Sequence, residues 1–540
     1  MSSDALRQCD VLVIGSGGAA LSAALRAASA GLSVLIIEKS SRPGGTTAMS
    51  GGATWVPANH HAREAGIEDS PAEVLTYLKS SAPQGWSETE LPLWRAFAAS
   101  AGEMLQFIET HTPLRFALTM EADPLLTNPG AKEHGRMLAP QPLRAWHKAG
   151  ARWRLPPTPL PRYWNYHEIL SRDIWRHPFR ETLRMSPCLL WRALTGVRTK
   201  GAALITGLLD GCLRYGCQLE TNAHAIKLRT TGRRVTGAYY SQCGRLTEVR
   251  VSKGVVLACG GFEWDALRRA EHFPGVFDFI ASPDSNTGDG HRMAEAIGAQ
   301  LAHMDQANIS GGIPAAKGTP HGLSVYFHYE PNVILVNRFG ERFVNEFTFN
   351  LGEALDERDA SGQPRQLPVW LIADADLLRR APLLRYYAWR KPGWMRTAPD
   401  LKQLAHMVGL PETTLAASIT RFNQLCRKGE DDDFGRHMTL MHGVGDNRFR
   451  GGMQAIARAP FIAIPFNRTF LATKGGPRTD EYGRVRHRDG TVIEGLYCAG
   501  VAMANPIGTR AIGAGTTLGP NLTWGFICGR SLAEGVPDTP

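Results

Sequence analysis

The sequence predicts an α/β fold, in which a largely parallel sheet is covered by helices. A β-branched strand, a glycine turn, an alanine-rich helix and a second strand follow one another over residues 10–38. Glycine is abundant, at 57 of 540 residues, which is about 11% against a usual 7% and is typical of backbone that turns tightly or approaches a ligand. With 43% hydrophobic and 20% charged residues the chain is not largely disordered, and its length suits roughly two to four domains.

The first strand, 10–14, leads directly into the pattern Gly15-x-Gly17-x-x-Ala20. Gly15 permits a tight turn, Gly17 lets the backbone approach a pyrophosphate, and Ala20 allows helix and strand to pack closely. The second strand ends at Glu38, 23 residues after Gly15, where a carboxylate can accept a hydrogen bond from a ribose hydroxyl. This Rossmann-like arrangement predicts a dinucleotide held by Gly15, Gly17, Gly18, Ala19, Ala20 and Glu38.

A second glycine-dense loop at 44–52, shortly after Glu38, favours a ligand larger than NAD. Near the carboxy terminus, Gly500 ends a predicted strand, and 513–519 lead into a predicted helix over 521–532. The amino end of a helix stabilises negative charge, as on a reduced flavin ring. The cofactor residues assigned in these segments are Lys39, Gly44, Gly45, Thr46, Thr47, Ser50, Gly51, Gly52, Gly500, Gly515, Thr516, Thr517 and Leu518.

The elements between these ends are predicted from their patterns. Ser70 and Pro71 form a helix-start signature, and the apolar spacing of 201–215 predicts another helix. A hairpin is expected over 333–346 with its turn near Gly340, whereas 430–433 is expected to be a solvated acidic turn. The remaining predictions are a long loop or lid over 152–178, strands at 217–227, 235–251 and 253–258, and helices at 291–297 and within 401–428.

Several of these segments resemble one known group of flavoproteins. Glu38-Lys39, Gly44-Gly45-Thr46 and Ser50-Gly51-Gly52 are similar to the fumarate reductase and 3-ketosteroid dehydrogenase family, and 52–57 are similar to its steroid-dehydrogenase branch. The resemblance implies FAD as cofactor and a Rossmann-like FAD-binding domain with an inserted α+β catalytic domain. The implied boundaries are 1–285 and 452–540 for the FAD-binding domain and 286–451 for the catalytic domain.

The same resemblance extends the cofactor site into the middle of the chain. It implies that the backbone at Ala225 faces the adenine and that the segment ending in Gly261 closes the nucleotide sheet. The turn before helix 291–297 is similar to a turn near the flavin, where Asp289 is either a ligand or a helix cap. The residues added in this way are Ala225, Ala258, Gly260, Gly261, Asn286 and Asp289.

The implied reaction is a dehydrogenation at a CH–CH bond beside a ketone. A base removes the proton next to the carbonyl while a hydride passes from the adjoining carbon to flavin N5, and the substrate is a cyclic ketone or a 3-ketosteroid-like compound. Gly515 matches the glycine whose N–H polarises the carbonyl. The tyrosines that the resemblance implies are missing, because Ala511 and Asn350 occupy two of their positions and 122–125 contain none.

Other residues are therefore candidates for the chemistry. Arg510 lies just before the flavin turn, and its planar guanidinium can bind a carboxylate or a carbonyl oxygen, although it can equally brace the loop through an acid. Two alternatives stay open: a fumarate-type reductase of an unsaturated acid, and a flavin-binding paralogue with altered catalysis. The candidate catalytic residues are Arg510, Gly515, Asn350 and Tyr329, and the weaker ones are Tyr326, His328, His134, Arg136 and His147.

Charge and cysteine content limit the kinds of partner and the location that the sequence predicts. The net charge of +10 is dispersed and accompanies no nucleic-acid motif, and no run of eighteen apolar residues predicts an integral membrane segment. Nine cysteines without a CxxC pair predict reduced thiols, a cytoplasmic location and no metal site. The expected partners are a small-molecule substrate and an electron acceptor, either a quinone or another carrier.

Overall fold

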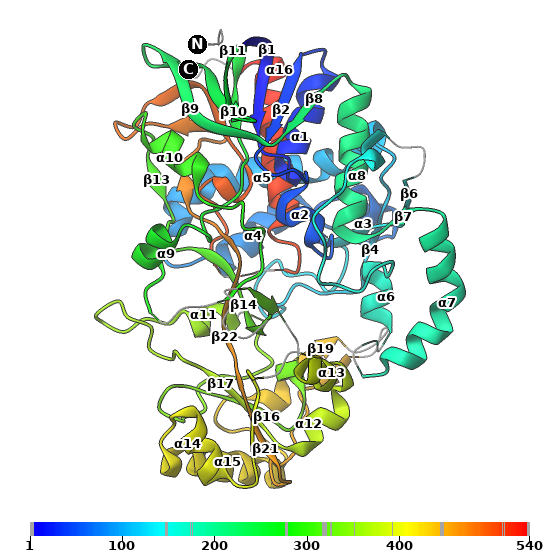
Figure 1. The fold of residues 1–540 in the computed structure, drawn as a ribbon, viewed down its shortest axis with the longest axis vertical. Helices are drawn as coiled ribbons and strands as arrows, with labels where there is room; N and C mark the ends of the chain where they lie inside the picture. Colours follow the sequence, from blue (N-terminus) through cyan, green and yellow to red (C-terminus); the bar gives the residue numbers. More distant parts are fainter. Residues whose placement is uncertain are drawn as a thin grey trace.

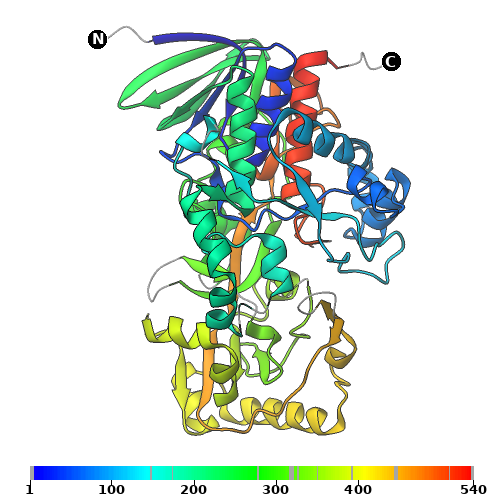
Figure 2. The ribbon, with the colours of Figure 1, turned by 90° about the vertical axis from the view of Figure 1, so that its right-hand side faces the viewer.

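The structure is a computed structural model. It describes residues 5–145, 149–172, 174, 176–275, 279–315, 321–324, 327–349, 351–390, 393–442, 448–509, 511 and 513–536. Figure 1 shows an upper unit that carries both ends of the chain and a lower unit formed by the middle of the chain. Figure 2, turned by 90°, shows β21 (Phe461–Pro465) and β22 (Asn467–Thr473), in orange, rising one after the other through the lower unit toward the upper unit.

The upper unit is built on a sheet with the strand order β24-β25-β11-β1-β2-β8. Its central strand β1 is parallel to both β2 and β11, and the segments 11–14, 34–37 and 255–257 of these strands are apolar and buried. Continuous apolar runs are typical of strands that are covered on both faces. The α/β fold class is therefore confirmed. The strands of this sheet are β1 Ala5–Ile14, β2 Val34–Glu38, β8 Gln218–Thr221, β11 Arg245–Leu257, β24 Arg484–Arg486 and β25 Val492–Cys498, with β9 Ala223–Thr231 and β10 Arg234–Gln242 as an antiparallel extension.

Two helices from opposite ends of the sequence pack side by side in this unit. They are α1 (Gly18–Ser29) and α16 (Leu518–Glu534). The helices approach closely because a Cβ at Gly525 would lie 2.1 Å from the carbonyl oxygen of Ala19. Contacts advance in the same direction along both helices, from Gly18 with Leu522 to Ala23 with Gly529. The two helices are therefore parallel, and their amino ends lie at the same edge of the unit. Helix α16 begins three residues before the predicted start at 521.

The lower unit contains two antiparallel sheets, in the orders β16-β17-β21-β18 and β12-β22-β14-β15, in which only β12 and β22 pair in parallel. Strands β21 and β22 lie within the segment 452–540, which is predicted to belong to the FAD-binding domain, yet they pair with strands of the lower unit. The three predicted domain boundaries stay a prediction. The strands are β12 Phe279–Ile280, β14 Ala307–Pro314, β15 Gly322–Ser324, β16 Val333–Val336, β17 Trp370–Ala373, β18 Arg396–Ala398, β21 Phe461–Pro465 and β22 Asn467–Thr473.

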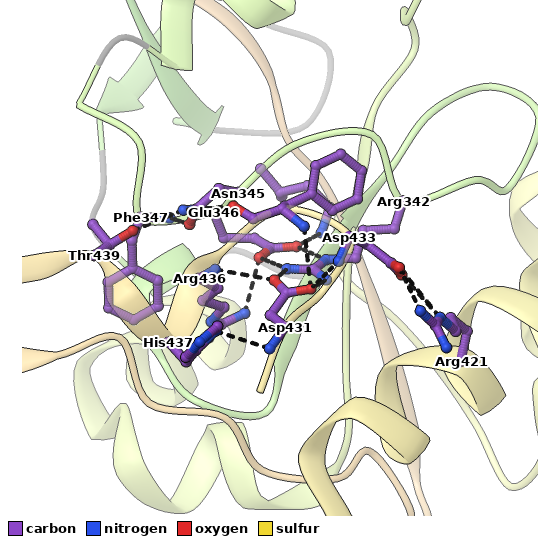
Figure 3. Close-up of polar contacts among 12 residues, drawn as sticks. Arg342, Asn345, Glu346, Phe347, Arg421, Asp431, Asp433, Arg436, His437 and Thr439 are labelled. Atoms are coloured by element: carbon purple, nitrogen blue, oxygen red, sulfur yellow. Dashed lines mark hydrogen bonds and ion pairs between the residues drawn. The ribbon is translucent and has the colours of Figure 1, made fainter. Parts of the chain in front are cut away.

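Two predictions for this unit are wrong in part. The turn at Gly340 forms as expected, since the Gly340 amide donates to the Asn337 carbonyl, but the second strand of the hairpin does not. Instead β16 pairs with β17, and an isolated bridge joins Val336 to Arg342 across the turn. The acidic turn is not fully solvated, because Asp431 is 1% exposed and binds the Arg342 guanidinium at 2.8 Å. The side chain of Arg342 is thus used in a buried ion cluster with Glu346, Asp431 and Arg436, which Figure 3 shows.

The remaining elements complete the covering of both units. The helix start at Ser70 is confirmed, because its hydroxyl accepts from the Glu73 amide and Pro71 is the first helical residue. The helices are α2 Gly45–Met49, α3 His60–Glu64, α4 Pro71–Ser81, α5 Trp86–His111, α6 Tyr166–Ser171, α7 Pro178–Leu194, α8 Lys200–Arg214, α9 Ala266–His272, α10 Asp289–Glu295, α11 Leu351–Leu355, α12 Ala375–Arg380, α13 Pro382–Arg390, α14 Leu401–Val408 and α15 Glu412–Lys428. The short strands are β3 Thr54–Trp55, β4 Phe116–Leu118, β5 Met137–Pro140, β6 Leu143–Arg144, β7 Val197–Arg198, β13 Leu301–Ala302, β19 Leu440–His442, β20 Arg448–Arg450 and β23 Gly476–Pro477.

Candidate flavin and substrate site

The turn after β1 presents the amino end of α1 to a ligand. Gly15 has φ +110°, and a Cβ there would lie 2.3 Å from the carbonyl oxygen of Ala258. Only glycine tolerates both the conformation and the close approach. The N-cap of α1 is Gly17, which has no side chain to cap the first-turn N–H groups. The Gly18 amide donates to the Thr47 hydroxyl, and the backbone donors of Ala19 and Ala20 at this helix end suit an anion such as a pyrophosphate.

Glu38 ends β2 beside this turn and links the two amino-terminal loops. Its carboxylate accepts from the Ser16 hydroxyl at 2.6 Å and from the Ser40 amide at 2.8 Å. The Ser16 oxygen in turn accepts from the Gly44 amide at 2.9 Å. Burial raises the pKa of Glu38. Sequence reasoning missed Ser16, which lies between the two motif glycines and joins the first loop to the second.

The second glycine loop folds onto α1 and α8. The Thr47 hydroxyl oxygen accepts from the Gly18 amide at 3.2 Å, so this loop closes over the amino end of α1. The Ser50 carbonyl accepts from Gly201 at the start of α8, and the Ser50 hydroxyl accepts from the Gly52 amide. The predicted cofactor residues of this loop, Gly44, Gly45, Thr46, Thr47, Ser50, Gly51 and Gly52, are thus held against those of the first turn.

The segments from the middle of the chain meet the same loops. Ala225 is buried on β9, and Ala258 follows β11, where its amide donates to the Ile14 carbonyl. A Cβ at Gly260 would lie 2.5 Å from Oδ1 of Asn286. The Asn286 amide group donates to Thr46 at 3.2 Å and to Glu263 at 2.7 Å. Gly261 accepts from the Gly288 amide through its carbonyl. These residues therefore lie together, although they are far apart in the sequence.

Lys39 and Asp289, both predicted to bind the cofactor, bind each other. The Lys39 ammonium lies 2.6 Å from the Asp289 carboxylate and also donates to Thr287. Burial acts to raise the pKa of Asp289, but the hydrogen bond and charge of Lys39 outweigh it, so the pKa lies below its usual range. The cap alternative for Asp289 is wrong, because the N-cap of α10 is Gly288 and Asp289 lies in the first turn.

The carboxy-terminal turn brings a second helix amino end to the site. Gly515 has φ +87°, a Cβ there would lie 2.6 Å from the Ala53 carbonyl oxygen, and the Gly515 carbonyl accepts from the Trp55 amide. Thr516 closes the turn by donating to the Gly513 carbonyl at 2.8 Å. Thr517 is the N-cap of α16, without a side-chain cap bond, and precedes Leu518. Gly500 packs onto the Cβ of Ala19 in α1, so this turn lies beside the first one.

The arrangement fits a dinucleotide that carries a flavin. The N-cap residues of two parallel helices, Gly17 and Thr517, make no side-chain cap bond and lie at the same edge of the sheet. Each helix is preceded by a turn with a glycine, Gly15 or Gly515, at which a Cβ would meet backbone atoms. One helix end suits a pyrophosphate and the other suits the negative charge of a reduced flavin ring.

A buried network lies directly behind Gly515. The Trp55 indole N–H donates to Asp123 at 2.9 Å, and Asp123 lies 2.8 Å from the Arg136 guanidinium. Arg136 also binds Asp69 at 2.7 Å. Arg136 was a weaker catalytic candidate, but two carboxylates occupy its guanidinium. It braces the wall of the site, and the segment 122–125 contributes Asp123 to that wall.

The segment before the carboxy-terminal turn is held by the lower unit. Thr509 accepts from the Ala307 amide at 3.0 Å, and Asn308 donates to Thr517 at 3.0 Å, both from β14. Lys474 is 1% exposed and donates to the Gly508 carbonyl, and burial lowers the pKa of Lys474 to about 8. Sequence reasoning missed this lysine because nothing in the primary structure places it beneath residue 508.

Part of the segment 152–178, residues 158–166, covers the second glycine loop. Thr158 donates to the Met49 carbonyl at 2.7 Å, and a Cβ at Gly51 would lie 3.0 Å from the ring of Tyr166. The Tyr166 hydroxyl donates to Glu121 at 3.1 Å. Burial raises the pKa of the Glu121 carboxyl to about 7. An acid that titrates near neutral pH therefore lies next to the predicted flavin loop, and sequence reasoning missed both members of this pair.

The other predicted catalytic residues are less informative. Arg510 and Asn350 lie outside the described residues, as do Tyr326 and His147. Tyr329 lies in the lower unit, where its ring is 5.3 Å from that of Phe347 and 4.0 Å from that of His328. His134 is described, and its Nδ1 atom is buried without a hydrogen-bond partner in the part of the chain that the structure describes.

One group of possible metal ligands occurs in the described part of the chain. His60 and His61 each place Nε2 within 2.9 Å of the same Glu109 oxygen, and the other Glu109 oxygen accepts from the Phe116 amide. The Nδ1 atom of His60 is buried without a hydrogen-bond partner among the described residues. Across the described residues, helices that are both long and apolar enough to cross a membrane are absent.

Comparison with known proteins adds to this geometry. A family model described as an FAD binding domain matches residues 10–518. The chain is 34% identical to 4-oxocyclohexanecarboxylate 2-dehydrogenase of Sinomonas cyclohexanicum, over 97% of this chain and 92% of that protein. It is 30% identical to 3-oxosteroid 1-dehydrogenase of Mycobacterium tuberculosis, over 98% of this chain and 99% of that protein.

A solved structure agrees with these two relatives. The crystal structure of 3-ketosteroid Δ1-dehydrogenase from Sterolibacterium denitrificans, in complex with 1,4-androstadiene-3,17-dione, superimposes with a TM-score of 0.86 at 30% identity. The match covers 98% of this chain and 100% of that chain. The similarity therefore extends over both units and not only over the nucleotide-binding turn.

Proposed function

Because this chain belongs to the FAD-binding domain family of flavoproteins, we propose that it dehydrogenates the carbon–carbon bond beside the ketone of a cyclic substrate. FAD is its cofactor, and the chain is an oxidoreductase. The observation that carries the proposal is the full-length similarity to two dehydrogenases of cyclic ketones, which differ in the size of the ketone that their names specify. A small-molecule substrate follows from the same relatives.

FAD, when bound, supplies the acceptor for the hydride. The residues that we propose to hold it are the predicted set around the two helix amino ends, with Glu38 toward the ribose and the 515–518 turn toward the flavin. Within this set, Asp289 is assigned the role of orienting Lys39. The Gly515 amide lies just before the amino end of α16, and we assign it to the ketone oxygen of the substrate. A hydrogen bond there favours the enolate that forms when the neighbouring proton leaves.

Glu121 is proposed as the base that takes this proton. Its pKa of about 7 suits proton transfer near neutral pH, because a base with a pKa close to the working pH combines a deprotonated population with a useful driving force. Tyr166 orients the carboxylate by donating to it. The C–H bond beside the ketone breaks with its proton going to Glu121, the hydride leaves from the adjoining carbon, and a carbon–carbon double bond remains.

The substrate class favoured here is a cyclic keto acid. The name of the 34% identical relative specifies a carboxylate on a cyclohexanone ring. Arg510 lies five residues before Gly515 in the sequence, and a guanidinium forms bidentate bonds with a carboxylate. We propose that Arg510 binds this group. The quinone or other carrier that accepts the electrons and the cytoplasmic location stay predictions.

Anaerobic bleaching of the flavin tests the proposal. The purified protein is mixed with 4-oxocyclohexanecarboxylate, with cyclohexanone, with a 3-ketosteroid and with succinate. Bleaching by one or more of the ketones is expected, and fastest by the keto acid. Bleaching by succinate alone, with reoxidation by an unsaturated acid, would establish the fumarate-type alternative. A lack of response to every compound would contradict the proposal.

The variant Arg510→Met tests whether Arg510 binds the carboxylate of the substrate or has another role. If Arg510 binds the carboxylate, the variant keeps its FAD and its reaction with cyclohexanone, while the apparent affinity for the keto acid falls by about tenfold or more. An equal loss with both substrates would assign Arg510 to the ketone oxygen or to bracing the loop.

A further inference from the structure

Helix α7 presents an apolar stripe to solvent. Phe179 is 84% exposed, Leu183 76%, Leu190 60% and Leu194 68%, while Trp191 beside them is 44% exposed. At 3.6 residues per turn, the spacing of the first four places them within an arc of about 60° along the whole helix. Figure 1 shows α7 at the outer edge of the molecule, beside α6. Large apolar side chains that gather in this way mark an interaction surface.

The inward face of the same helix is charged. Glu181 and Arg192 are 4% and 6% exposed. Arg192 binds both oxygens of Glu168 in α6 at 2.7 Å and also donates to the Tyr163 carbonyl. The polarity of α7 is thus the reverse of that in an ordinary surface helix, whose apolar residues face the core. Ion pairs anchor the helix, and the apolar residues of the stripe are left for a partner.

Arginines border the stripe, and the helix exposes no carboxylate. Arg180 and Arg184 are exposed on α7, whereas Arg176, just before the helix, pairs with Glu330 at 3.2 Å. Glu181, the acid within α7, is turned inward and is bound by Arg172 and Arg180. Arg144 lies over the ring of Trp191, with its guanidinium carbon 4.8 Å from the ring centroid. The exposed face therefore combines aliphatic side chains, aromatic rings and positive charge.

We propose that α7 docks the protein on the surface of an anionic lipid bilayer. The stripe defined by Phe179, Leu183, Leu190 and Leu194 inserts among the acyl chains, and the arginines contact the headgroups, as in amphipathic helices that lie in the plane of a membrane. A second copy of the chain suits this surface less well, because two-fold pairing of the stripes brings the arginine borders of both copies together.

The docking surface is connected to the substrate side of the molecule. Glu168, which anchors α7, belongs to α6, and α6 begins with Tyr166, whose ring covers Gly51. A bilayer beneath α7 would thus lie next to the segment that covers the predicted flavin loop. The proposal itself depends on the exposed face alone and holds whichever substrate the enzyme uses.

Vesicle flotation of the FAD-loaded protein tests the proposal. Vesicles of phosphatidylglycerol with phosphatidylcholine are compared with vesicles of phosphatidylcholine alone, at low and at high salt. The protein is expected to float with the anionic vesicles, and less so at high salt. The double variant Leu183→Glu/Leu190→Glu is expected to lower the partition coefficient about tenfold or more. Because both residues are exposed, the fold and the flavin spectrum are expected to stay unchanged.

Matched variants make the test specific. Leu267 is 85% exposed on α9, so Leu267→Glu introduces the same change elsewhere and is expected to leave flotation unaltered. Arg184→Glu is expected to weaken binding to anionic vesicles more than Arg233→Glu, which alters the net charge equally. The proposal is overturned if the native protein does not float with anionic vesicles or if Leu267→Glu is as harmful as the double variant. A dimer that the double variant dissociates, without vesicle binding, would assign the stripe to a second copy instead.

Discussion

Gly515 is constrained by conformation and by packing at once. Its φ of +87° disfavours any side chain, and a Cβ would lie 2.6 Å from the Ala53 carbonyl. We therefore expect Gly515→Ala to lower the free energy of unfolding by about 2–4 kcal/mol and to reduce the FAD content, because the turn must shift away from β3. Absorbance of bound flavin and thermal unfolding measure both effects.

The matched control for this substitution is Gly31→Ala. Gly31 has φ +89°, but a Cβ there meets no atom within 4 Å. The control should cost only the conformational part, about 1–2 kcal/mol, and should retain FAD. Equal loss of FAD in both variants would mean that close packing at Gly515 does not shape the site.

Tyr166 controls the proposed base through one hydrogen bond. Its hydroxyl donates to the Glu121 carboxylate and lowers the pKa of Glu121, against burial, which raises that pKa to about 7. Tyr166→Phe removes the donor, so the pKa of Glu121 rises further. Because the deprotonated form accepts the proton, the rate of flavin reduction should increase with pH through a midpoint that lies about one unit higher in the variant.

A second Tyr–Glu pair provides the control for this pH profile. Tyr240 donates to Glu220 at 2.7 Å, on β10 and β8 of the upper sheet. Tyr240→Phe should leave the pH profile of flavin reduction unchanged. A profile that does not move in Tyr166→Phe would remove Glu121 from the mechanism.

At the scale of elements, the buried ion cluster joins the turn after β16 to the segment after α15. Figure 3 shows Arg342 and Arg436 around Glu346 and Asp431, and all four side chains are at most 5% exposed. Removing one member leaves an uncompensated charge, so Arg436→Met should lower the free energy of unfolding by about 3–5 kcal/mol. The exposed pair Arg421–Asp433 gives the control, and Arg421→Met should cost at most about 1 kcal/mol.

The same cluster predicts how stability depends on pH. Burial opposes ionisation, but Arg342 and Arg436 hold the pKa of Glu346 below its usual range, and Arg342 does the same for Asp431. The stabilisation is therefore complete above the pKa of an unfolded carboxyl, roughly pH 4, and is lost as the pH falls through the lower folded values. Urea unfolding at pH 6 and at pH 3 measures this. The free energy of unfolding should fall less between pH 6 and pH 3 in Arg436→Met than in the native protein.

At the scale of the whole molecule, the cofactor site joins distant parts of the chain. Turns after β1, β2, β11 and β25 and the amino end of α16 surround one position. FAD should therefore stabilise the fold as a whole, by about 2.7 kcal/mol at a free concentration one hundred times its Kd. Thermal unfolding of the apoprotein with added FAD measures this. Riboflavin, which lacks the pyrophosphate, should stabilise far less, and equal stabilisation by both compounds would contradict the assignment of the α1 amino end.

The local patterns of the sequence determined the upper unit and its cofactor. The strand, glycine turn and helix at 10–29, the acid at Glu38 and the carboxy-terminal glycine turn depend on backbone conformation and short-range spacing, which the primary structure encodes directly. These patterns led to FAD and to the family, and both are confirmed. The glycine excess is explained in the same way, because many of these glycines are positions where backbone or side chains approach closely.

Only the tertiary structure decided which side chains share a site. The parallel packing of α1 and α16 brings residues about 500 positions apart to one edge, and the pairing of Lys39 with Asp289 replaces two separate assignments by one contact. The pair Glu121 and Tyr166, and Lys474 beneath Gly508, have no signal in their own segments. The spacing of the apolar stripe of α7 is visible in the sequence, but its outward direction is not. Burial and long-range contacts set the pKa of a carboxyl and the exposure of a leucine, and both are properties of the folded chain.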